Sequence, residues 1–168
     1  MVHARRPAKA ARAPLEEFDV NKLAIPHDAI VFVGDGRKAL FLRNDGDEKF
    51  PNLKTEQVFA DENPPTHEQG TDKPGSAFAR ASTHRRSSVE QTDWHHLEEH
   101  RFVERVAAAL ESVVRSRAVP ALVIAAPPRT LADLRRAFHA DVKKRIVAEV
   151  GKDLTNHPVS EIETHLLG

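Results

Sequence analysis

The feature that most constrains the fold is the continuous apolar run at residues 121–126, Ala-Leu-Val-Ile-Ala-Ala, which lies between two segments of helical pattern. A strand buried on both faces of a sheet has this pattern, because neither face needs polar side chains. The run is far shorter than the roughly 20 apolar residues of a membrane-spanning helix. We therefore expect a central strand in a sheet flanked by helices, with no membrane span and no membrane partner.

Two β-rich runs in the first half of the chain are separated by a tight-turn signal. Residues 29–33 are Ala-Ile-Val-Phe-Val and residues 38–43 are Lys-Ala-Leu-Phe-Leu-Arg, with Gly34-Asp35-Gly36 between them. An Asp-Gly step between two such runs is a strong indication of a β-hairpin. A third candidate strand lies at residues 53–59, so the first half is predicted to be an antiparallel meander.

Helical periodicity dominates the second half. A long helix is expected from Asp93, a plausible N-cap, to about Arg117. Its apolar stripe is formed by Val103, Val106, Ala107, Leu110 and Val114.

A short helix is expected to start at Thr130-Leu-Ala-Asp133, which resembles a capping box. For residues 146–150, strand and helix are close competitors, and we favour an edge strand that follows a helical turn at residues 140–144. Asn156-His157-Pro158 is expected to cap a last helix. The whole pattern predicts a single α/β domain, residues 25–168, with a mixed sheet of about five strands.

Charge is balanced overall but unevenly distributed. The chain has 25 Lys and Arg against 25 Asp and Glu, so any case for a polyanionic partner depends on where the charges lie. Residues 1–24 are predicted to be a disordered basic arm. The segment 61–92 is too long for an ordinary loop, and within it residues 73–89 carry Lys73, Arg80, Arg85 and Arg86 without one acid.

Two further groups could carry chemistry. His96-Leu-Glu-Glu99-His100 has the form of an inverted zinc-peptidase motif, in which two imidazoles bind the metal and a carboxylate activates water. A partly solvated polar cluster is the alternative interpretation. Arg129 and Thr130 follow the central strand at a helix start, where a guanidinium and free N–H groups could bind an anion; the alternative is that they are only solvated and capping. With no cysteine in the chain, disulfides, thiolate metal sites and cysteine nucleophiles are excluded.

Seven separated motifs resemble those of the bacterial host attachment proteins, which are required for attachment to host cells. The resemblance covers residues 25–167. In chain order the motifs are Ile25-Pro-His-Asp28, Gly34-Asp-Gly-Arg-Lys-Ala-Leu-Phe-Leu-Arg-Asn44, Asn63-Pro-Pro-Thr66, Gln69-Gly-Thr-Asp72, Val89-Glu-Gln-Thr-Asp-Trp-His95, Ala126-Pro-Pro-Arg-Thr-Leu131 and Lys152-Asp-Leu-Thr-Asn-His-Pro158.

That family is similar in turn to the middle domain of archaeal and eukaryotic peptide-chain release factors, a ribonuclease H-like α/β fold. The resemblance implies a ribosome or tRNA partner. Release factors carry a Gly-Gly-Gln tip on the corresponding loop, where it promotes hydrolysis of the peptidyl-tRNA ester. Residues 68–91 contain no Gly-Gly-Gln, so this activity is in doubt here.

The first functional hypothesis is therefore a cytoplasmic release-factor-like domain that binds RNA or the ribosome through Lys73, Arg80, Arg85 and Arg86. Arg129 and Thr130 would be a further anion contact, no cofactor is needed, and the effect on host attachment would be indirect. A metal-dependent hydrolase that uses His96, Glu99 and His100 is the second hypothesis. The third is an interaction module whose segment 61–92 folds on a protein partner.

Overall fold

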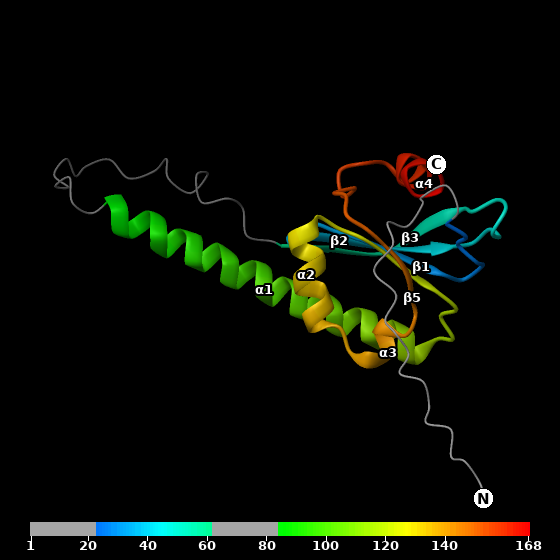
Figure 1. Cartoon of the computed structure of the whole chain (residues 1–168), viewed down its shortest axis with the longest axis horizontal. Helices are drawn as coiled ribbons and strands as arrows, with labels where there is room; N and C mark the ends of the chain where they lie inside the picture. Colours follow the sequence, from blue (N-terminus) through cyan, green and yellow to red (C-terminus); the bar gives the residue numbers. More distant parts are fainter. Residues whose placement is uncertain (1–22, 62–83) are drawn as a thin grey trace, which may run out of the picture.

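The computed structural model describes residues 23–61 and 84–168, of which residues 84–90 are described by their backbone. Five strands and four helices make up this part of the chain (Figure 1). They are, in order, β1 (Ile30–Gly34), β2 (Lys38–Asn44), β3 (Leu53–Ala60), α1 (His84–Ser116), β4 (Leu122–Ala125), α2 (Pro128–Ala137), α3 (Ala140–Lys143), β5 (Ile146–Val150) and α4 (Val159–Leu167). Except for Leu23 and Ala24, the predicted basic arm at residues 1–24 lies outside the described residues.

The strands form one mixed sheet in the order β3-β2-β1-β4-β5. β1 pairs antiparallel with β2, and β2 antiparallel with β3, as the Asp-Gly turn between the first two strands predicts. On its other side β1 pairs parallel with β4, which in turn pairs parallel with β5. The prediction of a single α/β domain with a five-stranded mixed sheet is confirmed. β5 is an edge strand, so the competing helical interpretation of residues 146–150 is wrong.

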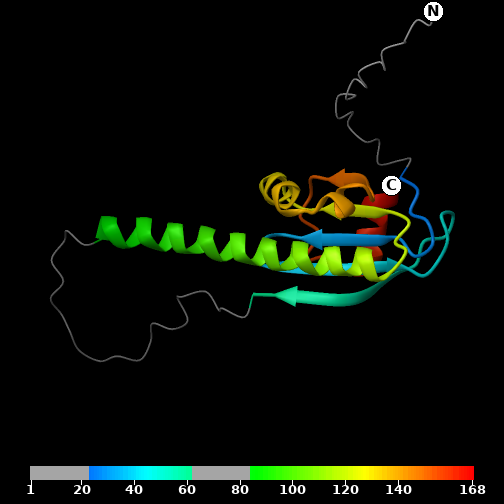
Figure 2. The same cartoon turned by 90° about the horizontal axis from the view of Figure 1, so that it is seen from below.

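Helices cover both faces of this sheet, which explains why its central strands are apolar throughout. Alternate residues of a strand point to opposite faces. Ile30 and Phe32 of β1 therefore face α1, α2 and α3 in one apolar cluster, whereas Val31 and Val33 face α4 in a second cluster. Figure 2 shows α1 running along one side of the sheet. β4 is likewise buried along its whole length, as its continuous apolar pattern predicts.

The long helix α1 begins earlier than the sequence suggests. It starts at His84, not at Asp93, so Asp93 is an exposed residue inside the helix and not its N-cap. Residues 84–92 contain neither Gly nor Pro, so nothing in their backbone preferences stops the helix from extending in that direction. Residues 84–92, which were expected to belong to the long segment 61–92, are therefore part of α1.

Only the C-terminal half of α1 belongs to the core. Burial begins at Phe102 and continues along the predicted stripe to Val114. The preceding residues from Gln91 to Arg101 are exposed or half-buried, and both views show this part of the helix extending beyond the sheet (Figures 1 and 2). The stability of α1 is therefore expected to come from its second half, because packing of an apolar face stabilises protein helices more than intrinsic propensity does.

The N-caps of α2 and α4 are both prolines. Helix α2 starts at Pro128, with Pro127 in the N-cap position, so Thr130 lies inside the helix and is not its cap. Proline is favoured at a first helical position because its missing N–H has no partner there anyway. Of the predicted capping residues Asn156-His157-Pro158, Pro158 occupies the N-cap position of α4, and it provides no side-chain hydrogen bond.

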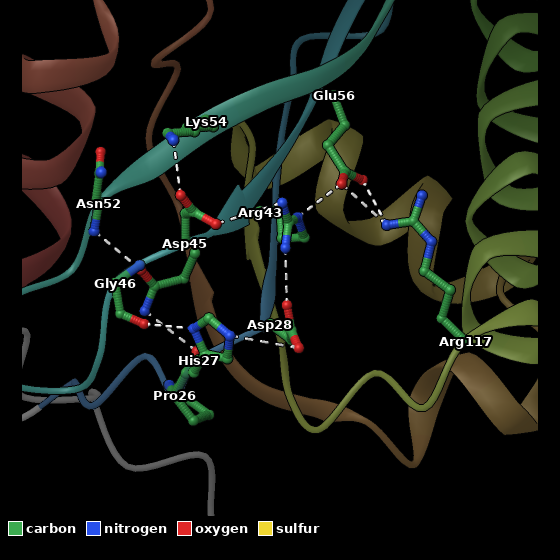
Figure 3. Close-up of polar contacts among 11 residues, drawn as sticks. Pro26, His27, Asp28, Arg43, Asp45, Gly46, Asn52, Lys54, Glu56 and Arg117 are labelled. Atoms are coloured by element: carbon green, nitrogen blue, oxygen red, sulfur yellow. Dashed lines mark hydrogen bonds and ion pairs between the residues drawn. The ribbon is translucent and has the colours of Figure 1, made fainter.

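An ionic network connects side chains at the edge of the sheet formed by the start of β1 and the end of β2 (Figure 3). Arg43 contacts three carboxylates: its Nη1 lies 2.9 Å from Asp28 Oδ1, its Nη2 3.5 Å from Asp45 Oδ1 and its Nε 2.8 Å from Glu56 Oε1. Arg117, just after α1, reaches Glu56 Oε2 at 2.9 Å. The hydrogen bond to Asp28 is the main cause of a raised pKa of Arg43.

The amide of Asn44 organises the turns at the same edge. Asn44 is fully buried, and its Nδ2 donates to the carbonyl oxygen of Ile25 at 2.7 Å. Its Oδ1 accepts from the N–H groups of Gly46 and Asn52, both at 2.9 Å. A Cβ at Gly46 would lie 2.1 Å from the Phe50 carbonyl oxygen, so this position needs glycine.

The asymmetric packing of α1 leads to a stability prediction. Leu110→Ala removes a fully buried side chain and is expected to lower the free energy of unfolding by about 2 to 5 kcal/mol. Leu97→Ala on the same helix, where the side chain is 41% exposed, should change it by less than about 0.5 kcal/mol. Urea denaturation measures both, and equal losses would contradict the packing described here.

The ionic network leads to a pH prediction. The Lys54 ammonium, whose Nζ donates to Asp45 Oδ2 at 2.6 Å, holds the pKa of Asp45 below its ordinary 3.8. A carboxyl with a lowered folded-state pKa stabilises the fold above its unfolded pKa, and this contribution is lost as pH falls through the folded value. The wild type should therefore be more stable than Asp45→Asn at pH 6.5, and the difference should vanish as the pH falls towards 2.5.

Lys54→Met is the matched variant for this test, because it removes the partner instead of the carboxyl. Its difference from the wild type in urea denaturation should shrink over the same pH range. Differences that stay constant down to pH 2.5 would show that the pair makes no pH-dependent contribution.

Candidate functional site

The candidate site lies at the opposite edge of the sheet, where the parallel strands β1, β4 and β5 have their carboxyl ends. Ligands of α/β proteins commonly bind outside this edge. The turn from β1 to β2, the start of α2 and the loop after β5 meet here. β3 also ends at this edge, because Ala60 pairs with Lys38, so residues 62–83 connect it to α1.

Asp35 shapes the turn between β1 and β2. Its Oδ1 accepts hydrogen bonds from the backbone N–H groups of Arg37 at 2.8 Å and Lys38 at 2.7 Å. Gly36 follows with a φ of 96°, a conformation that glycine adopts without steric strain. The turn thus fixes one carboxylate oxygen of Asp35 and leaves the other free to interact beyond the turn.

That second oxygen connects the turn to the loop after β5. Thr155, which is buried, places its Oγ1 3.0 Å from Asp35 Oδ2 and 2.7 Å from Asp153 Oδ1. Lys38 Nζ donates to the Thr155 carbonyl oxygen at 3.1 Å. A hydroxyl has one proton, so Thr155 donates to Asp35 or to Asp153 at any one time. Both carboxylates lie close to this hydroxyl, and Lys38 contacts the backbone of the same residue.

Arg129 and His96 join α2 to α1 above this turn. Arg129 Nη2 lies 2.6 Å from His96 Nδ1, and Glu99 Oε2 lies 3.7 Å from the same nitrogen. A guanidinium can only donate, so the contact requires His96 to accept at Nδ1 and to carry its proton at Nε2. The hydroxyl of Thr130 lies near the turn, 3.4 Å from the Asp35 carbonyl oxygen.

Of the predicted anion-binding residues, the structure brings Arg129 and Thr130 to this edge. The Arg129 side chain is exposed, whereas Thr130 is buried. Arg85 and Arg86 belong to the first turn of α1 by their backbone. Lys73 and Arg80 lie outside the described residues.

The three residues of the predicted metal motif do not come together. Glu99 Oε2 lies 3.7 Å from His96 Nδ1, which accepts from Arg129, whereas His100 Nε2 faces Glu104 Oε1 at 3.3 Å. Among the side chains of residues 23–61 and 91–168, no group of three or more His, Asp or Glu has an arrangement that could hold a metal ion. His96 and His100 therefore make separate contacts along the helix and do not share a common centre.

The hydrogen-bonded group of Asp35, Lys38, Asp153 and Thr155 is absent from the functional residues that the sequence suggested. Asp35 and Thr155 are 120 positions apart in the chain, and no local pattern links them. Their only sequence signal was that both belong to motifs that carry the family resemblance. From the sequence, the Gly34-Asp35-Gly36 segment favours a tight turn over a phosphate-binding loop, because tight turns need these residue types in any case.

The central position of Thr155 leads to a prediction. Thr155→Val keeps the shape of the buried side chain but leaves two carboxylates without the hydroxyl donor, so we expect a loss of about 1 to 3 kcal/mol in the free energy of unfolding. Thr164→Val is the matched control, because Thr164 is exposed on α4, and it should have less than about 0.5 kcal/mol of effect. Thermal or urea unfolding measures both variants. Equal losses in the free energy of unfolding would show that the hydrogen bonds of the Thr155 hydroxyl do not stabilise the fold.

None of the described helices is long and apolar enough to cross a membrane. A comparison with curated proteins finds no match. The sequence model of bacterial archaeo-eukaryotic release factor family 12 matches residues 28–166, which is most of the chain and includes every residue of the site described above. This supports the release-factor part of the family resemblance and carries no statement about attachment to host cells. The chain therefore belongs to bacterial archaeo-eukaryotic release factor family 12.

Proposed function

We propose that this protein is a release-factor-like domain that binds RNA on the ribosome. The observation that carries the proposal is the family match over residues 28–166, because it associates the whole α/β domain with release factors. The composition of the chain adds an electrostatic reason. Its net charge is zero, yet residues 73–89 carry four cations and no acid, and polyanions attract such local concentrations of positive charge.

The ends of the two elements that flank this part of the chain also support the proposal. β3 ends at Ala60, at the carboxyl edge of the sheet where Arg129 lies, and α1 begins at His84. Lys73, Arg80, Arg85 and Arg86 would neutralise phosphates, and Arg129 would add a contact at the body of the domain. If about four phosphates are contacted, binding should weaken with salt at a log–log slope of about −3 to −4.

The proposal includes no ester hydrolysis. Residues 68–91, which correspond to the release-factor loop, contain no Gly-Gly-Gln. The protein would occupy a site on the ribosome without cleaving peptidyl-tRNA, and it would act in the cytoplasm, where ribosomes are. An effect on attachment to host cells would then be an indirect result of altered translation.

Ribosome sedimentation tests the proposal. In a sucrose gradient of cell lysate at low salt, the wild-type protein should travel partly with ribosomal particles and should be released as the salt concentration rises. The double variant Arg85→Glu and Arg86→Glu should remain at the top of the gradient, because each reversal replaces an attraction to phosphate by a repulsion.

A second double variant, Lys49→Glu and Arg136→Glu, controls for net charge. Both residues are exposed and lie away from the carboxyl edge of the sheet. This variant changes the total charge by the same amount and should still sediment with ribosomes. Free migration of the wild type at every salt concentration would rule the proposal out, and equal release of both variants would rule out a localised binding surface.

A further inference from the structure

Helix α1 exposes a large aromatic side chain next to an aliphatic one. Trp94 is 56% exposed and Leu97 is 41% exposed. Trp94 is the only tryptophan of the chain, and tryptophan is on average a highly buried residue. Both residues lie before Phe102, in the part of α1 that extends beyond the sheet (Figure 2), and neither belongs to an apolar cluster of the described residues.

Helix geometry places these two residues on the side of α1 opposite the core. At 100° per residue, Trp94 lies about 180° from the buried Val103 and about 160° from the buried Leu110. Leu97 is within about 60° of Trp94. His96 and Glu99 point instead towards the core side, where Arg129 contacts His96. The Trp94 side of the helix is therefore separate from the site at the carboxyl edge of the sheet.

Two arginines continue the same side of the helix. Arg101 and Arg105 lie within about 20° of Trp94 around the axis, about two and three turns further along. Both side chains are exposed, and neither makes an ion pair with a residue in the described part of the chain. The Arg105 guanidinium lies 5.2 Å from the centre of the Phe102 ring, a cation–π contact that holds it against the helix without neutralising it. Trp94, Leu97, Arg101 and Arg105 together are called the Trp94 face below.

The nearby carboxylates already have partners. Glu98 is half-buried and engaged in an interaction of its own. Glu104 Oε1 lies 3.3 Å from His100 Nε2, on the flank of the helix. The Trp94 face therefore combines an aromatic surface with two guanidinium groups that have no anionic partner in the described structure.

Single-stranded RNA fits this combination better than a protein does. Every base has a face that can stack on an indole, and the phosphates next to a stacked base can pair with arginines. Two partly exposed apolar side chains are far too few for a typical protein interface, which covers about 800 Å² on each partner. The unpaired cations favour a polyanion.

We propose that the Trp94 face is a binding site for single-stranded RNA, in which a base stacks on Trp94 and Arg101 and Arg105 bind the neighbouring phosphates. This inference rests on the proposed function and deepens it, because it assigns part of the RNA contact to described side chains outside the cationic segment at residues 73–89. The cationic segment ends at residue 89, inside α1, which begins at His84. The Trp94 face follows it further along the same helix.

The single tryptophan makes the test specific to this site. Titration of the full-length protein with a single-stranded oligouridylate of about ten nucleotides should quench the tryptophan fluorescence. Trp94→Ala should weaken binding by about 5- to 100-fold, measured by the anisotropy of labelled RNA, because stacking on an aromatic side chain is lost. Trp94→Phe should restore most of the affinity, since a ring remains for stacking.

The arginines are tested by the salt dependence of the same titration. Arg101→Ala and Arg105→Ala should each reduce the log–log salt slope by about 1. Arg136→Ala is the matched control: this arginine is also exposed on a helix, with a side chain 83% exposed, and its loss should leave affinity and slope unchanged.

The outcomes separate this inference from the proposed function. If the protein binds RNA or sediments with ribosomes, but the fluorescence is unchanged and Trp94→Ala binds as tightly as the wild type, the Trp94 face is not an RNA site while the proposed function stands. If the wild type neither binds the oligonucleotide nor sediments with ribosomes, both are overturned. Quenching with loss of affinity in Trp94→Ala supports both.

Discussion

The pairing of β1 with two different neighbours is the constraint on which the rest of the structure depends. β1 is antiparallel to β2 and parallel to β4, so the hairpin half and the helical half of the chain form one sheet through this strand. Its side chains contribute to both apolar clusters. The two edges of the sheet consequently differ: one is closed by the ionic network around Arg43 and by the buried Asn44 amide, and the other collects the carboxyl ends of the parallel strands.

The closed edge and the carboxyl edge have different consequences for function. At the closed edge, charges are paired with one another, which leaves little for a ligand to bind. At the carboxyl edge, Asp35 and Thr155 fix the turn and the loop after β5, while Arg129 remains exposed beside α1. Helix α1 crosses this edge, with half of its length in the core and half beyond it. A rigid helix that starts outside the body can present side chains to a large partner at a distance from the sheet.

The sequence predicted the elements whose signals are local. The Asp-Gly turn predicted the hairpin, and the uninterrupted apolar run at residues 121–126 predicted a doubly buried strand. Helix starts were predicted less well, because polar residues such as Asp93 and Thr130 favour N-caps only on average, and the helices extend past them. The contact between Asp35 and Thr155 could not be predicted, since it depends on the folded sheet bringing two distant loops together. The exposure of Trp94 could not be predicted from the sequence either, because helical phase alone does not show how far the rest of the domain extends along the helix.

We propose above that this neutral domain binds RNA through the cationic segment at residues 73–89 and through the Trp94 face of α1. Ultraviolet crosslinking in intact cells, followed by identification of the peptides that carry nucleotide adducts, tests it most directly. Ribosomal RNA adducts are expected on peptides from residues 73–105. Adducts confined to α4 or to the ionic network around Arg43, or no adducts above those of an unrelated protein of equal abundance, would contradict it.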